Sequence, residues 1–380
     1  MDKLTIILPT EASFEESEKR GLLSIWKSRF HIYSKYFTEV EVYSFDFKDF
    51  SSYFSHNVKC HVIPLLNIRI AYLKHFFYNL YLLYKARKMS NPIRAISTTY
   101  FILPVIRVLF KKHIILSFQY AYAETSKRDF GIFRGFLGDI LERLSIAGSQ
   151  TIIATTEELR RYLLRKYGRH AIVIPNFVDT DVFSASSEKN DYILYAGRLI
   201  RSKGLNYLLT AFQAINKRFP DFKLKIAGGT EMEVELYREK VKELGLKEIE
   251  FLGSVEHDEI AKVMKRALAI VLPTVTREGL PKVLLEAMAC GTVCIATDVP
   301  GSRDLITDGV NGLLVPPKDS DSLAEAIMSV ISDKEMREKL TRNGFETSRK
   351  YSIQKVLKDE VEIIMNIHQR NTDHLKYLYN

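Results

Sequence analysis

The sequence has few cysteines, with only Cys60, Cys290 and Cys294 among its 380 residues. Three is an odd number and no two of them have CxxC spacing, which argues against a disulfide framework and against a structural zinc site. A reducing compartment, the cytosol, fits this cysteine usage best. Proline and glycine are also scarce, at 11 and 18 residues, which excludes collagen-like and low-complexity chains.

Long apolar runs are missing as well. No stretch approaches the roughly 18 to 20 apolar residues that span a bilayer. The apolar run at residues 4–8 is too short for the core of a signal peptide. We therefore expect a cytoplasmic protein whose membrane contact is at most peripheral. With 46% hydrophobic and 27% charged residues, the chain is long enough to form two globular domains.

Acidic residues are absent from one long interval, between Asp49 and Glu124. This interval contains ten Lys or Arg and fifteen aromatic residues, and it accounts for the formal net charge of +9. Cations interleaved with Tyr and Phe suit an anionic lipid surface, where rings lie at the headgroup level and cations meet phosphates. The interval therefore favours a peripheral site on the inner membrane face.

Two other interpretations of this interval remain open. An ordinary helix could pack one apolar face on a core and leave its cations in water. That face would consist of Leu73, Phe76, Phe77, Leu80 and Tyr84. A nucleic-acid surface is the third interpretation, and it receives the least weight.

Short apolar runs alternate with amphipathic stretches, a pattern typical of parallel sheets flanked by helices. The predicted strands are residues 4–8, 40–43, 58–65, 93–97, 114–118, 151–154 and 171–174, then 192–196, 223–227, 248–252, 268–272, 293–297 and 312–315. We predict an α/β fold of two Rossmann-like doubly wound domains facing across a cleft. The amino-terminal domain would span 1–176 and the carboxy-terminal one 177–350, with a last helix at 351–380 returning toward the first.

Open α/β sheets bind ligands outside the carboxyl ends of their strands, so functional residues are expected in the loops that follow strands. The loop after 192–196 contains Gly197, Arg198 and Lys203, and it opens a helix. Two cations and free helix N–H groups can there face one anion such as a diphosphate. A cation in the first turn of a helix opposes the helix dipole, which favours a bound anion as the compensation.

Two further loops contain glycines that allow a ligand to approach the backbone. Gly228 and Gly229 follow the strand at 223–227, where they equally suit an ordinary turn. Gly253 follows the next strand, and its loop is a candidate for contacts with a base.

The loop after 268–272 is the most informative. Pro281 is predicted at the first position of a helix that Gly291 ends, which leaves the N–H groups of Gly279, Leu280 and Lys282 free to bind an anion. Two carboxylates lie near the same helix end. Glu278 precedes the helix and Glu286 is inside it, and paired acceptors of this kind bind sugar hydroxyls well.

Together these motifs resemble the retaining glycosyltransferases of family 4, the glycosyl transferases group 1, which have the GT-B fold. The resemblance covers the second half of the chain, through residues 174–183, 196–204, 278–291, 298–302 and 309–316, and part of the first half at 140–160. It implies a UDP- or GDP-sugar donor in the carboxy-terminal domain and an acceptor in the other. It implies no cofactor and no metal.

The resemblance also assigns roles to residues. Arg198 and Lys203 would bind the diphosphate and stabilise its leaving charge, and Glu286 would accept from the ribose hydroxyls. Glu278, the third catalytic candidate, would hold the transferred sugar with the N–H groups of Gly279 and Leu280. The other donor-binding candidates are Gly197, Gly228, Gly253 and Lys282.

Two departures from the family affect the acceptor side. The usual glycine pair after the first strand is replaced by residues 9–13, which include Glu11. The usual histidine after the fifth strand is Gln119, which can bind a sugar hydroxyl but cannot titrate near neutral pH. Glu11 and Gln119 are our acceptor-side candidates.

Two D-x-D sequences are not predicted to bind a metal. One, at 179–181, falls in the predicted hinge, and the other, at 319–321, begins a helix, where Asp is favoured. The histidines form no zinc-like cluster.

The predicted function is transfer of a hexose to an acceptor that is lipid-linked or a glycan precursor, without nucleic acid as a partner. A nucleotide-sugar epimerase or a phosphorylase on the same fold is the alternative enzyme. A non-catalytic protein that binds nucleotide sugars or nucleic acid is the alternative of another class.

Overall fold

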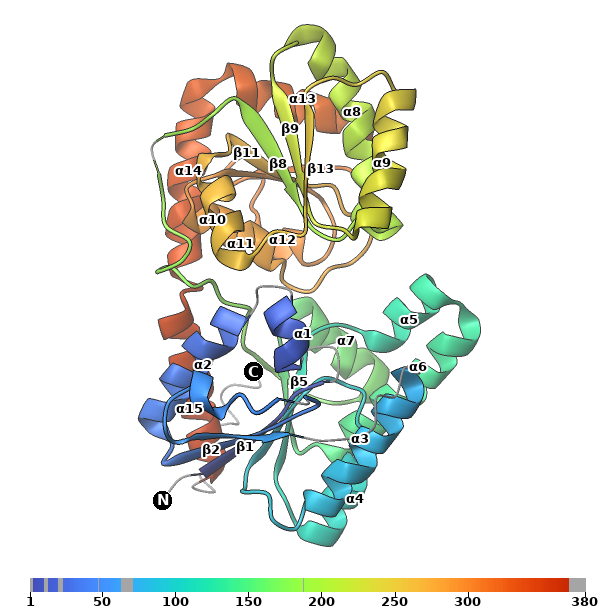
Figure 1. Ribbon diagram of the computed structural model, residues 1–380, viewed down its shortest axis with the longest axis vertical. Coiled ribbons are helices and arrows are strands. Elements are labelled where there is room, and N and C mark those ends of the chain that lie inside the picture. Colours follow the sequence, from blue (N-terminus) through green and yellow to red (C-terminus); the bar gives the residue numbers. More distant parts are fainter. Residues whose placement is uncertain are drawn as a thin grey trace. The chain divides into compact units, whose positions relative to one another are not determined.

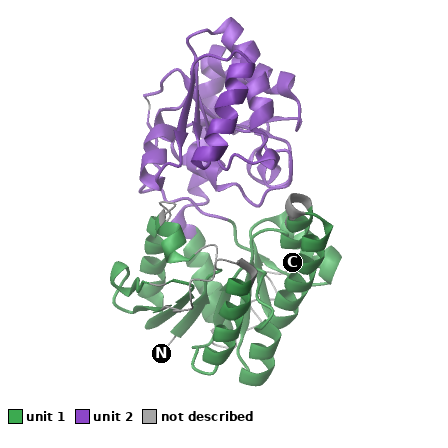
Figure 2. Ribbon diagram, turned by 45° about the vertical axis from the view of Figure 1, so that its right-hand side comes forward, with its two compact units in different colours: residues 1–175, 356–380 green, residues 176–355 purple. Residues whose placement is uncertain are grey.

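The computed structural model describes residues 3–9, 13–19, 23–46, 48–62, 71–186 and 188–368. The chain divides into two compact units, which Figure 2 shows in different colours. Unit 1 comprises residues 1–175 and 356–380, and unit 2 comprises residues 176–355. The chain therefore crosses between the units twice.

Unit 1 is built on seven parallel strands in the order β3-β2-β1-β4-β5-β6-β7 (Figure 1). They are β1 (Lys3–Ile7), β2 (Glu39–Ser44), β3 (Val58–Val62), β4 (Ile93–Ile96), β5 (Ile114–Phe118), β6 (Thr151–Ala154) and β7 (Ile172–Val173). Strands β4, β5 and β6 are buried along their whole length. Helices cover both faces of a parallel sheet, which explains why these strands are nearly continuous apolar runs.

Helices connect the successive strands of unit 1, and one more helix, α15, belongs largely to unit 1 although it follows unit 2 in the sequence. They are α1 (Phe14–Lys19), α2 (Leu23–Tyr36), α3 (Ala71–Lys85), α4 (Leu103–Phe110), α5 (Tyr122–Phe130), α6 (Ile132–Gly148), α7 (Glu157–Tyr167) and α15 (Ile353–His368), with the 3-10 helix η2 (Ser51–Tyr53). Helix α7 begins and ends at residues that are typical helix caps. The Thr156 hydroxyl accepts from the amide of Leu159 at 3.1 Å, and Gly168 ends the helix in the left-handed conformation.

Helix α3 buries a different face from the one that its sequence suggested. Its buried residues include Tyr78 and Leu82, and the Tyr78 hydroxyl donates to the backbone oxygens of Leu8 and Tyr43 at 2.8 and 2.9 Å. The predicted core face is instead exposed, at 40 to 78% of each side chain: Leu73, Phe76, Phe77, Leu80 and Tyr84. Packing of that face on a core is therefore wrong, because α3 is apolar on two sides and spacing alone does not distinguish them.

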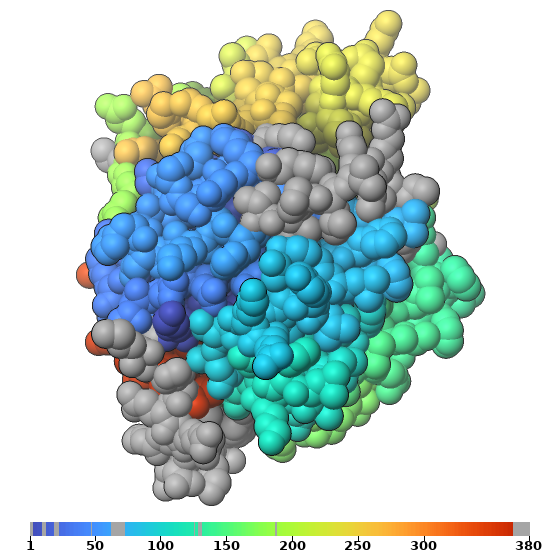
Figure 3. All heavy atoms as spheres, turned by 60° about the horizontal axis from the view of Figure 1, so that its bottom comes forward, coloured from blue at the N-terminus to red at the C-terminus, as the bar shows by residue number. Residues whose placement is uncertain are grey.

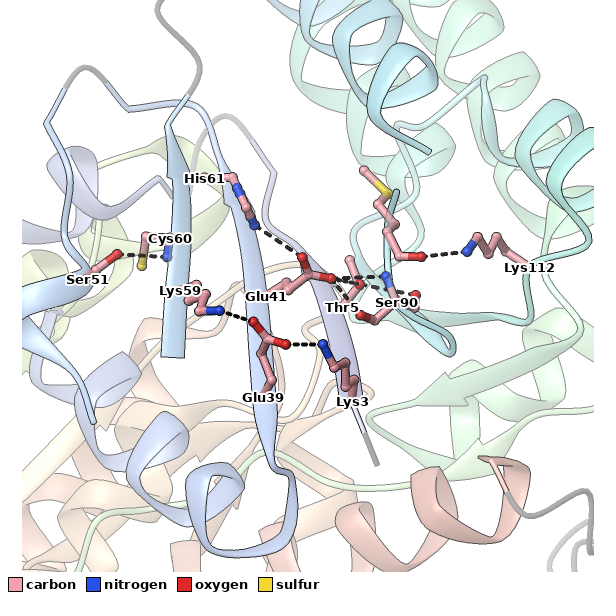
Figure 4. A network of polar contacts seen from close by, with 11 residues as sticks. Lys3, Thr5, Glu39, Glu41, Ser51, Lys59, Cys60, His61, Ser90 and Lys112 are labelled. Carbon is pink, nitrogen blue, oxygen red and sulfur yellow. Dashed lines mark hydrogen bonds and ion pairs between the residues drawn. The ribbon is translucent and has the colours of Figure 1, made fainter. Parts of the chain in front are cut away.

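A polar network crosses one side of the first three strands (Figure 4). Glu41 of β2 accepts hydrogen bonds from the amide and hydroxyl of Ser90 at 3.0 and 2.7 Å, and its other oxygen lies 3.4 Å from His61. Burial alone would raise the pKa of Glu41, but the hydrogen bonds from His61 and Ser90 lower it to about 2. This carboxylate ties the segment before β4 to the sheet.

Helix α15 is attached to unit 1 through a buried carboxylate. Glu360 is fully buried and forms an ion pair with Arg94 of β4. The Tyr33 hydroxyl donates to Glu360 at 3.0 Å, and Arg29 lies 3.4 Å from it. Burial lowers the pKa of Arg94 to about 10. Since an unpaired buried charge is costly, each partner requires the other.

Unit 2 is built on six parallel strands in the order β10-β9-β8-β11-β12-β13. They are β8 (Tyr192–Ala196), β9 (Lys223–Ala227), β10 (Ile249–Gly253), β11 (Ala269–Leu272), β12 (Val293–Thr297) and β13 (Leu313–Val315). Its helices are α8 (Leu205–Arg218), α9 (Glu231–Glu243), α10 (His257–Arg266), α11 (Lys282–Ala289), α12 (Ser302–Leu305), α13 (Ser320–Ser332) and α14 (Lys334–Arg349), with the 3-10 helix η3 (Arg201–Lys203).

Both sheets reverse their strand order at one point, which lies between β1 and β4 in unit 1 and between β8 and β11 in unit 2. The predicted class of two Rossmann-like doubly wound domains is confirmed. In such sheets the crevice at the reversal is where ligands bind.

Candidate functional site

The loops that leave β8 and β11 meet at the point where the unit 2 sheet reverses. Lys203 Nζ, at the end of η3, lies 2.6 Å from Glu278 Oε1, and the Thr274 hydroxyl donates to the same oxygen at 2.7 Å. The Lys203 and Glu278 side chains are only 18 and 17% exposed. The structure thus brings together one predicted cation and one predicted carboxylate. Sequence reasoning missed Thr274, although a polar residue just beyond a strand's carboxyl end is a usable signal.

Close backbone packing holds these two loops in register. The backbone oxygen of Ser202 accepts from the amide of Val275 at 2.9 Å and lies 3.0 Å from the Thr274 hydroxyl, whose single proton it shares with Glu278. Gly204 has a φ of +72°, and a Cβ there would lie 1.9 Å from the Pro273 oxygen. Only glycine combines this conformation with this approach.

Three predicted glycines lie at the adjacent ends of β8, β9 and β10. The amide of Gly228 donates to the Gly253 oxygen at 2.6 Å. Gly228 has a φ of +116°, and a Cβ on it would lie 2.1 Å from the Gly197 oxygen. The close approach that requires glycine at position 228 is therefore an approach of the protein's own backbone.

Arg198 follows Gly197 and its side chain is exposed. The Tyr195 hydroxyl donates to the Arg198 backbone oxygen at 2.7 Å, and burial raises the pKa of Tyr195 far above its ordinary value. Among the described residues, none forms an ion pair or hydrogen bond with the Arg198 guanidinium. Its cation is thus available to an external anion beside the strand end.

The segment between β11 and α11 is held by a second close contact. The amide of Glu278 donates to the Pro300 oxygen at 3.0 Å. Gly301 has a φ of +95°, and a Cβ there would lie 2.2 Å from the Gly279 oxygen. Neither the Gly279 amide nor the Leu280 amide donates to any acceptor in the described part of the chain. Both are therefore free donors before α11, as predicted.

The start of α11 differs from the prediction by one residue. Pro281 is the N-cap, in an extended conformation, and the helix begins at Lys282. The backbone oxygen of Pro281 accepts from the amides of Leu284 and Leu285 at 3.2 and 3.4 Å, as an N-cap carbonyl does. The predicted start of the helix at Pro281 is therefore wrong by one residue. The last helical residue is Ala289, and Gly291 ends the helix as predicted. Gly291 has a φ of +64°, its amide donates to the Met288 oxygen at 3.1 Å, and the amide of Thr292 donates to the Ala287 oxygen at 2.9 Å.

Lys282 and Glu286, the other donor candidates on α11, face different partners. Lys282 Nζ lies 5.2 Å from the centre of the Phe177 ring, a cation–π contact. Glu286 Oε1 lies 3.4 Å from Nε2 of His257, and His257 is the first residue of α10. Sequence reasoning also missed His257, which follows the Gly253 loop.

The acceptor-side candidates belong to unit 1. Gln119 directly follows β5 and is exposed, and its backbone oxygen accepts from the Thr155 hydroxyl at 3.2 Å. Glu11 lies outside the described residues.

The two D-x-D sequences form local turns. Asp319 caps α13 by accepting from the amides of Asp321 and Ser322 at 3.1 and 3.0 Å. Asp179 accepts from the amide of Asp181 at 3.1 Å. Over the ranges that the structure describes, no group of three or more His, Cys, Asp or Glu side chains could hold a metal ion.

Comparison with known proteins places part of the chain beside a described family. Residues 179–347 match the family model described as Glycosyl transferases group 1. The matched segment forms most of unit 2, and its description agrees with the resemblance found in the sequence.

Curated relatives agree with this family. The chain is 32% identical over 213 residues to a glycosyltransferase of Methanocaldococcus jannaschii, and this alignment covers 56% of this chain and 58% of the relative. It is 32% identical over 235 residues to the phosphatidyl-myo-inositol mannosyltransferase of Mycolicibacterium smegmatis, which covers 60% and 58%. The chain therefore spans less than two thirds of the length of the relatives it matches.

Solved structures cover nearly the whole chain. Sucrose-phosphate synthase from Thermosynechococcus elongatus has a TM-score of 0.79 at 18% identity, over 97% of this chain and 100% of that one. HepE from Anabaena, in complex with UDP-glucose, has a TM-score of 0.74 at 17% identity, over 96% and 100%. At this identity the likeness shows the fold, the GT-B fold.

Proposed function

We propose that this chain transfers a sugar from a nucleoside diphosphate sugar to an acceptor hydroxyl, with retention of the anomeric configuration. The observation that carries this proposal is the cluster at the reversal of the unit 2 sheet. There Lys203, Glu278 and Thr274 are in contact beside the free amides of Gly279 and Leu280.

The cluster suits a reaction in which negative charge develops on a departing diphosphate. Lys203 and the unpaired cation of Arg198 would stabilise that charge, and the free amides before α11 add helix-terminal dipoles. Glu278, which donates no hydrogen bond when ionised, would accept from hydroxyls of the sugar. Two cations and a helix terminus would do this without a metal or another cofactor.

Similar proteins support a nucleoside diphosphate donor. HepE was solved in complexes with UDP and with UDP-glucose, and the mycobacterial relatives are named mannosyltransferases. We accordingly propose UDP-sugars and GDP-sugars as the donors to assay. Retention would follow if the acceptor attacks the face from which the diphosphate leaves, as in retaining glycosyltransferases of family 4.

Replacing Glu278 by alanine tests the proposal. Because Glu278 would hold the sugar and not the nucleotide, E278A should lower the transfer rate by at least about a hundredfold. The affinity for the nucleoside diphosphate should stay within about threefold of wild type. The measurement combines product analysis with a titration of UDP and GDP.

The control is E250A, which removes a half-exposed glutamate paired with Lys225 elsewhere in unit 2. Equal activity of E278A and E250A would contradict the proposal. Product formed from donor alone, without acceptor, would instead indicate the epimerase alternative, and dependence on inorganic phosphate would indicate a phosphorylase.

We further propose that the acceptor is presented at an anionic membrane surface, on the inner face. The exposed apolar side of α3 adjoins the start of α4, since the ring of Phe76 stacks on that of Phe101 at 5.8 Å. Helix α4 in turn packs on α6. In Figure 3 the cyan atoms, which belong to residues around α3 and α4, form one continuous area of the surface.

Further exposed apolar side chains lie on α4 and on α6. Val108 and Leu109 are 71 and 67% exposed, and Phe133 and Phe136 are 74 and 62% exposed. The exposed cations on or just after α3 and α4 are Arg87, Lys88, Arg107 and Lys111. Apolar side chains beside cations, without acids in the interval 50–123, match an anionic lipid surface in charge. Within the described residues no helix has the length and apolarity needed to cross a membrane.

Vesicle binding tests the membrane surface. The double variant F133S/F136S should reduce binding to phosphatidylglycerol-containing vesicles by about tenfold, because it removes two exposed aromatic rings. M232S/L236S is the matched control, since Met232 and Leu236 on α9 are 73 and 61% exposed in unit 2. Equal binding to anionic and neutral vesicles at moderate salt would contradict the proposal. Tight binding to nucleic acid with steep salt dependence would favour the rival interpretation.

A further inference from the structure

Glu286 is a largely buried carboxylate, and one of its oxygens has no partner among the residues that the structure describes. Its side chain is 14% exposed, and Oε1 lies 3.4 Å from His257 Nε2. In the described part of the chain, His257 is the only side chain that contacts the Glu286 carboxylate through a hydrogen bond or ion pair. A carboxylate has about four acceptor sites, so the second oxygen, Oε2, keeps its capacity for hydroxyl donors.

His257 is held in place mainly by packing. Its side chain is 7% exposed, and its ring meets that of Phe183 edge-on, with centres 4.8 Å apart. Its Nδ1 is buried and, among the described residues, has no hydrogen-bond partner. The contact with Glu286 is thus the one polar interaction found for this imidazole.

This arrangement is unfavourable if His257 serves packing alone. A buried polar nitrogen without a partner costs free energy, and an apolar ring in the same place would avoid that cost. The tautomer that fits has its proton on Nε2, which donates to Glu286, and leaves Nδ1 with only a lone pair. The two oxygens of a carboxylate are held in one plane. A donor that fixes the position of one oxygen therefore also restricts where the other oxygen points.

We infer that His257 is a positioning residue for Glu286. It binds Oε1 and thereby orients Oε2 to accept from the ribose hydroxyls of the nucleotide. The inference rests on the proposed function, which makes Glu286 the ribose acceptor. It assigns no contact between His257 and the ligand.

Titrations with matched nucleotides test this role without any turnover. The probes are UDP and 2′,3′-dideoxy-UDP, or the guanosine pair if GDP binds more tightly. Wild type should bind the ribose form at least about tenfold more tightly, because hydroxyls donate to a charged acceptor. H257F keeps the ring and its packing but has no donor, so it should lower this ratio by about threefold or more while leaving the dideoxy affinity unchanged.

Two further variants separate positioning from loss of structure. H257Q places an amide donor near the position of Nε2 and should restore the ratio toward the wild-type value. E286A should abolish the preference for ribose, and H257F/E286A should lower it no further, because the two residues act through one carboxylate.

An H257F ratio equal to wild type would overturn the inference, and so would an H257F effect that is equally large in the E286A background. A loss of affinity for both nucleotide forms that H257Q does not rescue would show a merely structural role, and would also overturn it. If the wild-type chain binds neither UDP nor GDP, the proposed function itself is contradicted.

Discussion

Lys203 and Glu278 are 75 positions apart in the sequence and 2.6 Å apart in unit 2. Both side chains are largely buried, and the cost of desolvating two such charges can exceed the attraction between them, so stability alone does not explain this pair. The ammonium group has three donors, and Glu278 is its only partner among the described residues. Two donors of Lys203 therefore remain for a ligand.

Replacing Lys203 tests this view at the residue scale. K203A should lower the transfer rate by at least about a hundredfold, because it removes a cation placed where the diphosphate charge develops. It should also weaken binding of the nucleoside diphosphate, unlike E278A. The measurement is the steady-state rate together with the dissociation constant.

K225A is the matched control for K203A, since Lys225 lies 2.9 Å from Glu250 in the same unit. It should leave both quantities near their wild-type values. Equal effects of the two lysine variants would contradict a ligand role for Lys203.

Most of the candidate site residues were proposed from the sequence because they lie in loops next to recognisable strands. Thr274 and His257 could not, since their importance depends on which side chain each one touches. Glu278 and Glu286 look like a pair in the sequence, yet in unit 2 each contacts a different partner. Spacing along a chain predicts proximity to a helix end but not the direction of a side chain.

At the scale of elements, the strands were predicted best. Five of them, β5, β6, β8, β9 and β12, have the predicted limits, because apolar runs bounded by polar residues mark buried parallel strands clearly. The exposed face of α3 was not predicted. That helix is apolar on two sides, and only the tertiary contacts of Tyr78 decide which side is buried.

The junction between the β8 and β11 loops gives an element-scale prediction. G204A should destabilise the chain by at least about 2 kcal/mol more than G245A, because both glycines have a left-handed φ but only Gly204 meets another backbone. A Cβ at Gly245 would meet nothing within 4 Å. Thermal unfolding midpoints of the two variants measure the difference, and equal midpoints would refute the claim that this contact constrains the loops.

At the scale of the whole molecule, the chain closes back on its first unit. Arg94, Tyr33 and Glu360 come from distant parts of the sequence and meet in the core of unit 1. Such a cluster has no local sequence signature. The periodicity of the sequence therefore predicted helix α15 but not the ion pair that attaches it to unit 1. The absence of acids between Asp49 and Glu124 likewise acquires a meaning only when the exposed faces of α3, α4 and α6 are known.

The central claim is that the reversal point of the unit 2 sheet binds a nucleoside diphosphate. Hydrogen exchange of the wild-type chain, with and without saturating UDP or GDP, tests it most directly because it locates the bound ligand along the backbone. We predict slower exchange in the loops at 197–204 and 274–282 and near the start of α10. Unchanged exchange in these loops, or protection confined to unit 1, would contradict the account.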